Sequence, residues 1–158
     1  MLIKQLSIFL ENKSGRLNEV SQILGSNGIN MSAFSVADTS EFGILRLIVS
    51  DPELACKVLR ENQFSVSLTD VVCLNCPNEP GALGKTLQIL SDNKVSIAYL
   101  YAYSMGDSAN VVLKPDQLEL CIKVLQEHQM ELVKASELYK IWGSVSCVYN
   151  LFFKGHME

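Results

Sequence analysis

Hydrophobic residues follow two different periods along the first part of the chain. In residues 2–10, Leu6, Ile8 and Leu10 alternate with Gln5 and Ser7, which is typical of a strand with one buried face. From about Arg16 the apolar residues recur at the spacing of one side of an α-helix instead. The pattern therefore predicts a strand, a short loop and a helix.

Two more strands, a second helix and a last strand follow. Residues 29–37 and 43–50 are rich in large apolar residues, and the short segment between them suits a hairpin. Asp51 and Pro52 favour a helix start. Proline lacks a backbone N–H group, and in the first turn of a helix this group would have no hydrogen-bond partner. Residues 64–68 return to strand alternation. The order β-α-β-β-α-β is the split βαβ or ferredoxin-like arrangement.

The same pattern occurs a second time. Residues 10–66 align without gaps on residues 76–132, and a repeat of this length is one complete small domain. The matches include Asn12 and Asn78, Gly15 and Gly81, Leu17 and Leu83, Asn27 and Asn93, and the Gln-Ile-Leu runs at 22–24 and 88–90. Strands are expected in the second copy near 71–76, 95–103, 108–114 and 130–136, and helices near 81–93 and 116–128.

The repeat predicts an α+β protein of two ferredoxin-like βαββαβ domains, at residues 1–69 and 70–137. No linker rich in Pro, Gly or Ser separates them, so the last strand of the first domain is expected to run almost directly into the second domain. The apolar tail at 138–158 has no counterpart in the repeat. An extra strand or an apolar arm that covers a sheet edge or a neighbouring chain would explain it.

Composition restricts the classes of function. The 158 residues are 48% hydrophobic and carry a formal charge of −4, which argues against a nucleic-acid binder with a basic surface. The sequence has no apolar run close to the length of about 18 residues that a membrane span needs. The N-terminus is too polar from Lys4 onward for a signal peptide. An odd count of five cysteines without such a signal indicates reduced thiols in the cytoplasm.

The loop before the first helix of each unit is the strongest candidate site. Residues 12–17 and 78–83 both fit Asn-x-x-Gly-x-Leu. A helix N-terminus offers unpaired N–H groups and a partial positive charge, which suit a carboxylate. Glycine allows a ligand close to the backbone, and an asparagine oxygen can accept from an ammonium group. On spacing alone, a turn that merely caps the helix explains the motif better than a ligand site does.

With the residues that follow it, this motif resembles the opening of an ACT domain. That pattern has Asp or Asn, then Pro-Gly-x-Leu, a helix, and a strand that starts like Ile-Asn-Ile. Asn78 to Leu83 followed by Val95-Ser96-Ile97, and Asn12 to Leu17 followed by Ile29-Asn30-Met31, are similar to it. The first unit departs at Ser14, where proline is usual, and the second at Ser96, which stands where Asn30 stands in the first.

ACT domains are ferredoxin-like regulatory modules that commonly bind amino acids between paired domains, so the resemblance implies ligand contacts in both units. In the first unit these are Asn12, Gly15, Arg16, Leu17, Asn30 and Met31. In the second unit they are Asn78, Gly81, Ala82, Leu83, Ser96 and Ile97.

Other chemistry has little support. Cys73 and Cys76 form a C-x-x-C, but it lies in an expected strand with no second ligand pair, so we interpret both as packing residues. The histidines, His128 and His156, have no nucleophile or carboxylate at a suggestive spacing. We expect no catalytic site, metal or cofactor. Tyrosines at 99–103 place three rings on one strand face, to pack against helices or a second subunit, or to line a pocket.

The sequence therefore predicts a cytoplasmic, free-standing sensor that binds a free amino acid at interfaces between ACT-like domains, as a homodimer and without enzymatic activity. It would act on a target enzyme or regulator. One alternative is a regulatory subunit of an amino-acid biosynthetic enzyme, for example one like the acetolactate synthase small subunit, that acts through protein contacts. A small ferredoxin-like enzyme with a pocket between the domains is the other.

Overall fold

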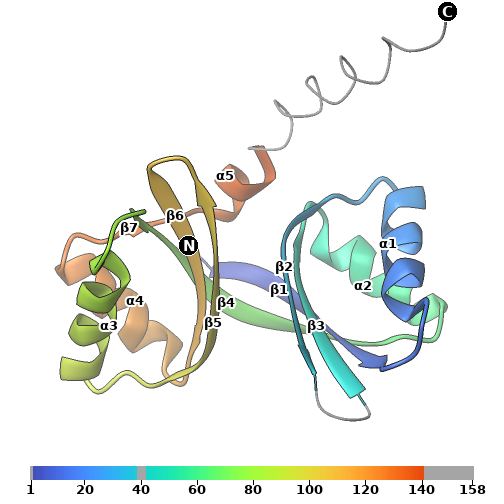
Figure 1. The fold of residues 1–158 in the computed structure, drawn as a ribbon, viewed down its shortest axis with the longest axis horizontal. Helices are drawn as coiled ribbons and strands as arrows, with labels where there is room; N and C mark the ends of the chain where they lie inside the picture. Colours follow the sequence, from blue (N-terminus) through green and yellow to red (C-terminus); the bar gives the residue numbers. More distant parts are fainter. Residues whose placement is uncertain (1, 39–41, 141–158) are drawn as a thin grey trace, which may run out of the picture.

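A computed structural model of the protein describes residues 2–38 and 42–140 (Figure 1). The first unit contains helices α1 and α2 and four strands, in the predicted order. Its elements are β1 (Leu2–Glu11), α1 (Arg16–Ser26), β2 (Met31–Asp38), β3 (Phe42–Val49), α2 (Pro52–Glu61) and the first part of β4 (Ser65–Pro77). The side chain of Asp51 accepts a hydrogen bond from the Leu54 N–H at 2.9 Å, which caps α2 as Asp51-Pro52 predicts.

The second unit repeats this order with one correction. It contains the rest of β4, then α3 (Ala82–Asp92), β5 (Ile97–Met105), β6 (Ser108–Pro115), α4 (Leu118–Glu127), β7 (Glu131–Leu132) and α5 (Ala135–Lys140). The strand expected at 130–136 was wrong in length, because β7 has only two residues and α5 begins at Ala135. The expected tail lies outside the described residues except for its first three positions, which belong to α5.

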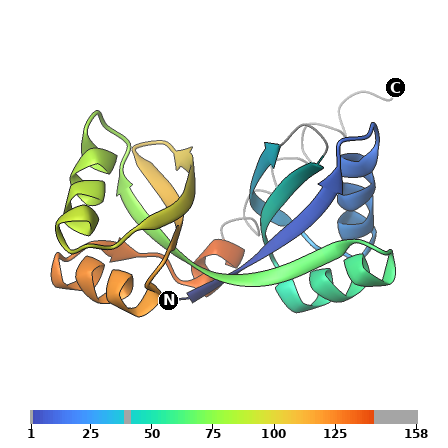
Figure 2. The same ribbon diagram turned by 90° about the horizontal axis from the view of Figure 1, so that it is seen from below.

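The described strands form one antiparallel sheet. Its order is β2-β3-β1-β4-β6-β5, and β7 pairs with residues 74–75 of β4 along the edge opposite β6. The strand β4 serves both units: residues 65–72 pair with β1, and residues 72–77 pair with β6. Figure 2 shows β4 running from one unit into the other. Residue 70, where we expect the domain boundary, therefore lies inside a strand.

The two units agree in register as well as in order. Leu10 lies opposite Gly43, and the corresponding Cys76 lies opposite Ala109. Each second strand has an irregularity at the same place, between Met31 and Ala33 in β2 and between Ile97 and Tyr99 in β5. The gapless alignment of the sequences is thus also an alignment of the structures.

Each unit buries its own core between the sheet and its two helices. In the first unit, alternate residues of β1 and β3, including Leu6, Ile8 and Leu47, pack against Val20 and Leu24 of α1. The second core has the same construction around Leu74, Leu90, Leu113 and Leu125. All four long helices lie on the outer sides of the molecule (Figures 1 and 2).

The helix-free faces of the two units turn toward each other, with α5 between them (Figure 1). A third cluster of buried residues lies there, which includes Ile3 and Ile48 from the first unit, Val112 from the second, and Leu138 from α5. The tyrosines of β5 belong to this side of the sheet. Tyr99 and Tyr101 bond to the buried Gln5 of β1 at 2.8 and 3.0 Å, so they join the two units.

The described cysteines pack in the interior, as predicted. Cys56, Cys73, Cys76 and Cys121 are buried and free of disulfides. Cys76 lies in the core beneath the helices of the second unit, and Cys73 lies in the cluster between the units. The two residues therefore point to opposite faces of β4, as residues three apart in a strand do.

Candidate functional site

The loop between β1 and α1 makes a tight turn that ends at Gly15. The Lys13 N–H donates to the Glu11 carbonyl at 2.7 Å, and the Arg16 N–H reaches the Lys13 carbonyl at 3.4 Å. Gly15 then caps the helix with φ 90°, in the left-handed region that favours glycine. Gly81 has the same role with φ 87°. The glycine of each motif is therefore required by the backbone.

Helix α1 presents unpaired backbone donors next to Gly15. The Glu19 N–H already donates to the Gly15 carbonyl at 2.9 Å, whereas the N–H groups of Leu17 and Asn18 precede the first complete helical bond. The helix dipole adds partial positive charge at the same end. This end of α1 can therefore accept an anionic group such as a carboxylate.

A hollow of about 300 Å³ lies beside this helix end. Its walls come from the end of β1, the loop, the start of α1, and the facing strands. The lining residues are Leu10, Glu11, Asn12, Lys13, Arg16, Leu17, Val36 and Gly43. The Asn12 side chain approaches β3 because position 43 is glycine: a Cβ there would lie 3.4 Å from Asn12 Oδ1.

Arg16 is held at the rim of this hollow by two contacts. Its Nη1 lies 2.6 Å from Glu19 Oε2, and its guanidinium carbon lies 4.3 Å from the centre of the Phe64 ring. The Nε atom is buried and has no hydrogen-bond partner. Since a guanidinium has five donors, Arg16 retains donors for a ligand carboxylate.

Lys13 and Glu11 add one charge of each sign to the rim. The Lys13 ammonium lies 2.7 Å from Glu11 Oε2. The hydrogen bond and the charge of Lys13 lower the pKa of the Glu11 carboxyl, which is therefore ionised near neutral pH. An amino acid carries both charges too, so this polar hollow offers a counterpart for each of them.

A second hollow of about 230 Å³ lies along the edge of the sheet, between α1 and β2. Its walls are Leu17, Val20 and Ser21 of α1, Met31, Phe34 and Val36 of β2, and Leu45 and Leu47 of β3. Leu17 and Met31 are residues that the sequence predicts as contacts. The sequence analysis missed Phe34 and Val36. Their signal was large apolar residues alternating with Ala33, Ser35 and Ala37 along one strand.

Asn30 lines neither hollow, although its neighbour Met31 lines the second. It precedes the end of β2 at which Met31 pairs with Val49, whereas Asn12 lies near Gly43 at the other end of β3. The Asn30 N–H donates to Ser50 Oγ at 3.0 Å. Ser96 has the equivalent bond, since its N–H donates to Asp116 Oδ1 at 3.1 Å.

The second loop differs from the first in its polar groups. The side-chain nitrogen of Asn78 donates to the Gly106 carbonyl at 3.1 Å, so it fastens the loop to the turn between β5 and β6. Ala82 is buried, and Leu83 and Ile97 pack against the second core. Glu79 and Ala82 stand where the first unit has Lys13 and Arg16. The predicted contacts of the second unit therefore form a less cationic loop.

Residues 2–38 and 42–140 contain neither a candidate metal cluster nor a helix that could cross a membrane. No group of three or more His, Cys, Asp or Glu residues is placed to hold a metal ion in this part of the chain. Among the helices described, none has the length and apolar character that a membrane crossing needs. His128 ends α4, where its Nδ1 lies 2.9 Å from the Val124 carbonyl oxygen.

Two βαββαβ units that share a sheet, each with a glycine-capped loop at one end, define a tandem ferredoxin-like module. A family model described as an ACT domain pair matches residues 1–142. The chain therefore belongs to the ACT domain pair family, and the resemblance seen in the loops is confirmed.

Solved structures agree with this assignment. The chain is similar to protein BT0572 from Bacteroides thetaiotaomicron, with 53% identity over 89% of this chain and 97% of that chain and a TM-score of 0.86. It has the fold of the regulatory subunit of aspartate kinase from Thermus thermophilus, with 14% identity over 80% of this chain and 93% of that one and a TM-score of 0.63. A comparison with curated protein sequences finds no match.

Proposed function

We propose that this protein binds a free amino acid at the β1–α1 loop of its first unit and thereby regulates another protein, without catalysing a reaction. The observation that carries the proposal is the polar hollow at the N-terminus of α1, where Asn12, Lys13 and Arg16 surround unpaired backbone donors. Membership of the ACT domain pair family supports the same function.

The two charged groups of an amino acid have separate partners in this hollow. The carboxylate accepts from the N–H groups after Gly15 and from Arg16, since charge-assisted hydrogen bonds are the strong ones. The ammonium group donates to the side-chain oxygen of Asn12 and to the Glu11 carboxylate. No bond is made or broken in this arrangement, which is why we propose a binding protein and not an enzyme.

Ligand binding can regulate the association of modules because the hollows lie at the edge of the sheet. Strand β2 ends the sheet, and its Phe34 and Val36 side chains are 66% and 51% exposed. We infer that two copies associate as a homodimer and that the ligand lies where modules meet. A ligand that binds one arrangement more tightly than another shifts the population between them.

The regulated target is an enzyme or regulator of amino-acid metabolism in the cytoplasm. The likeness to regulatory subunits of aspartate kinase supports a role as a regulatory subunit of an amino-acid biosynthetic enzyme. Affinity purification of the protein from its own organism tests this role: a catalytic subunit recovered in stoichiometric amount is the expected result. Recovery of the protein alone would favour a free-standing sensor.

A thermal-shift screen against the twenty amino acids tests ligand binding. A ligand present at about 100 times its Kd stabilises the folded state by about 2.7 kcal/mol, which corresponds to a rise in Tm of about 5–10 °C for a chain of this size. We expect a rise in Tm with selected amino acids only, and Asn12→Ala should abolish it. A flat screen would contradict amino-acid binding and leave regulation through protein contacts.

A further inference from the structure

The polar hollow and the apolar hollow of the first unit share two residues. Leu17, at the start of α1, and Val36, on the edge strand β2, contribute to the walls of both. The two spaces measure about 300 and 230 Å³. A small molecule whose charged end occupies the first therefore has the second directly beside it.

The two hollows differ sharply in chemistry. Four residues of the polar hollow, Glu11 to Lys13 and Arg16, carry charged or amide groups. The apolar hollow has seven apolar side chains, and Ser21 is the one polar residue among its lining residues. It offers no charged partner, and burial of an unpaired ammonium or carboxylate carries a large free-energy penalty.

From this contrast we infer that the ligand is an α-amino acid with an uncharged, apolar side chain, such as leucine, valine, methionine or phenylalanine, and that the first unit holds it. This inference rests on the proposed function and names the ligand class of that site. The charged groups of the amino acid occupy the polar hollow, and its side chain extends past Leu17 and Val36 into the apolar hollow.

The second unit supplies an internal comparison. At the positions that correspond to Lys13 and Arg16 it has Glu79 and Ala82, so both cations that favour a carboxylate are replaced. Ala102 replaces Val36, which removes part of the wall that the two hollows share. The features that would recognise an amino acid with an apolar side chain thus occur together in the first unit.

Isothermal titration calorimetry on the purified full chain, dialysed free of amino acids, tests the inference with a graded series of ligands. Glycine, alanine, valine and leucine lengthen the apolar side chain, and threonine, asparagine and lysine are the polar counterparts. Each buried methylene should tighten binding about four-fold, so leucine, with three more side-chain carbons, should bind about 60-fold more tightly than alanine. Asparagine and lysine should bind more weakly than leucine by at least as much.

Val36→Thr provides the matched variant. It keeps the shape of a β-branched residue on an exposed strand but places a hydroxyl group in the shared wall. The affinity for leucine should fall several-fold while the affinity for alanine changes little. Leu54→Thr, on α2 and outside both hollows, is the control, because Leu54 has a comparable partial exposure of 37%; its leucine affinity should be unchanged.

The possible failures are distinguishable. Tightest binding of threonine, asparagine or lysine would overturn the apolar ligand class and leave amino-acid binding intact. The same follows if Val36→Thr and Leu54→Thr affect leucine equally. If none of the seven amino acids binds, the apolar ligand class is overturned, and a flat thermal-shift screen against all twenty would overturn the proposed amino-acid binding as well.

Discussion

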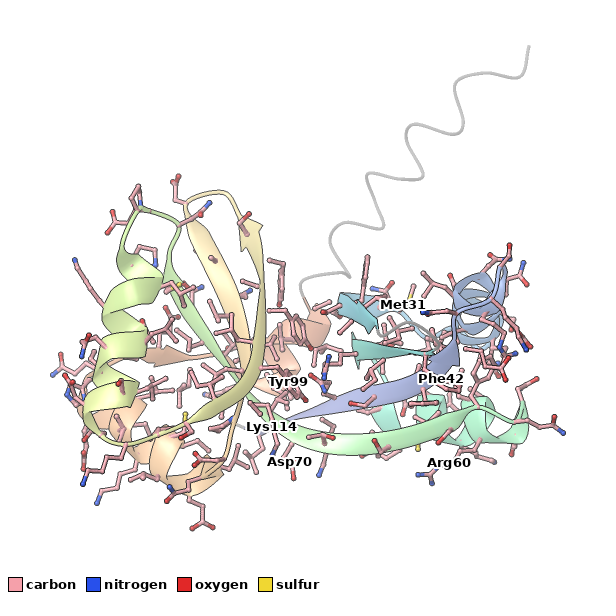
Figure 3. The ribbon with its side chains drawn as sticks, turned by 60° about the horizontal axis from the view of Figure 1, so that its bottom comes forward. Met31, Phe42, Arg60, Asp70, Tyr99 and Lys114 are labelled. Atoms are coloured by element: carbon pink, nitrogen blue, oxygen red, sulfur yellow. The ribbon has the colours of Figure 1, made fainter. Side chains whose placement is uncertain are left out.

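The guanidinium carbon of Arg46 lies 3.9 Å from the centre of the Tyr99 ring. Arg46 belongs to β3 of the first unit and Tyr99 to β5 of the second, so this stacked pair joins the helix-free faces of the two units. Figure 3 shows Tyr99 between the units, directed toward the first. The hydroxyl group of Tyr99 also accepts from Gln5 at 2.8 Å. One side chain thus makes two of the contacts that fix the units relative to each other.

Substitutions of this pair should weaken the junction between the units. Tyr99→Leu removes both the cation–π contact and the hydrogen bond, whereas Tyr99→Phe removes only the bond. We expect Tyr99→Phe to lower the free energy of unfolding by about 1 kcal/mol. A double-mutant cycle of Arg46→Met and Tyr99→Leu should give a coupling energy of about 0.5–1 kcal/mol in urea denaturation. A coupling of zero would show that the stacked pair contributes nothing.

The two motif asparagines should differ in what they do. Asn12 lines the polar hollow, so Asn12→Ala should weaken amino-acid binding about ten-fold, as removal of one charge-assisted bond predicts. Asn78 fastens its loop to the Gly106 carbonyl, so Asn78→Ala should cost about 1 kcal/mol of stability and leave the affinity for amino acids nearly unchanged. Calorimetric titration and thermal unfolding of both variants measure the two quantities. Equal losses of affinity would contradict the assignment of the site to the first unit.

Glycine substitutions at the helix start and the helix end should have opposite signs. Gly15 has φ 90°, with no atom within 4 Å of an added Cβ, so Gly15→Ala introduces backbone strain alone and should destabilise by about 1–2 kcal/mol. Gly25 lies inside α1 and also has free space around it. Gly25→Ala should therefore stabilise by about 0.5–1 kcal/mol. Chemical denaturation of both variants is the measurement, and loss of stability in both would contradict this account.

Alkaline pH should destabilise the junction. Burial raises the pKa of the Cys73 thiol from 9.0 to about 12 and that of Tyr103 from 10.0 to about 12. Burial also raises the pKa of Tyr101. These groups deprotonate more readily in the unfolded chain, so the stability they contribute is complete below about pH 9 and decreases up to about pH 12.

Thermal unfolding between pH 7 and 11 checks this dependence. The Tm should decline from about pH 9 upward, and the decline should be shallower in Cys73→Ala and Tyr103→Phe when each is compared with its own value at pH 7. An unchanged slope in both variants would show that other groups control the alkaline transition.

The local structure of each unit could be predicted from its own segment. The change from alternating to helical spacing at Arg16 identified the start of α1, and Asp51-Pro52 identified the start of α2. Such signals are local, because side-chain periodicity and cap chemistry depend on residues a few positions apart. The length of β7 was overestimated. The apolar residues after Met130 continue into α5, and apolar spacing over so few residues does not distinguish a strand from a helix.

The candidate site was predictable in part. The loop motif identified Asn12, Gly15, Arg16 and Leu17, which the structure places around one helix end. It did not identify Phe34 and Val36, because only the pairing of β2 with β3 brings them beside α1. The same pairing places Asn30 at the far end of the strand. Proximity within a motif therefore did not establish proximity in space.

By itself, the sequence determined that the chain contains two ferredoxin-like units, each with a glycine-capped loop before its first helix. Only the tertiary structure decided that β4 belongs to both units, that their helix-free faces meet, and that Gln5 bonds to Tyr99 and Tyr101. The physical reason is separation along the chain: these partners are 94 and 96 residues apart. Hydrophobic periodicity indicates which side of a strand is buried but not what covers it.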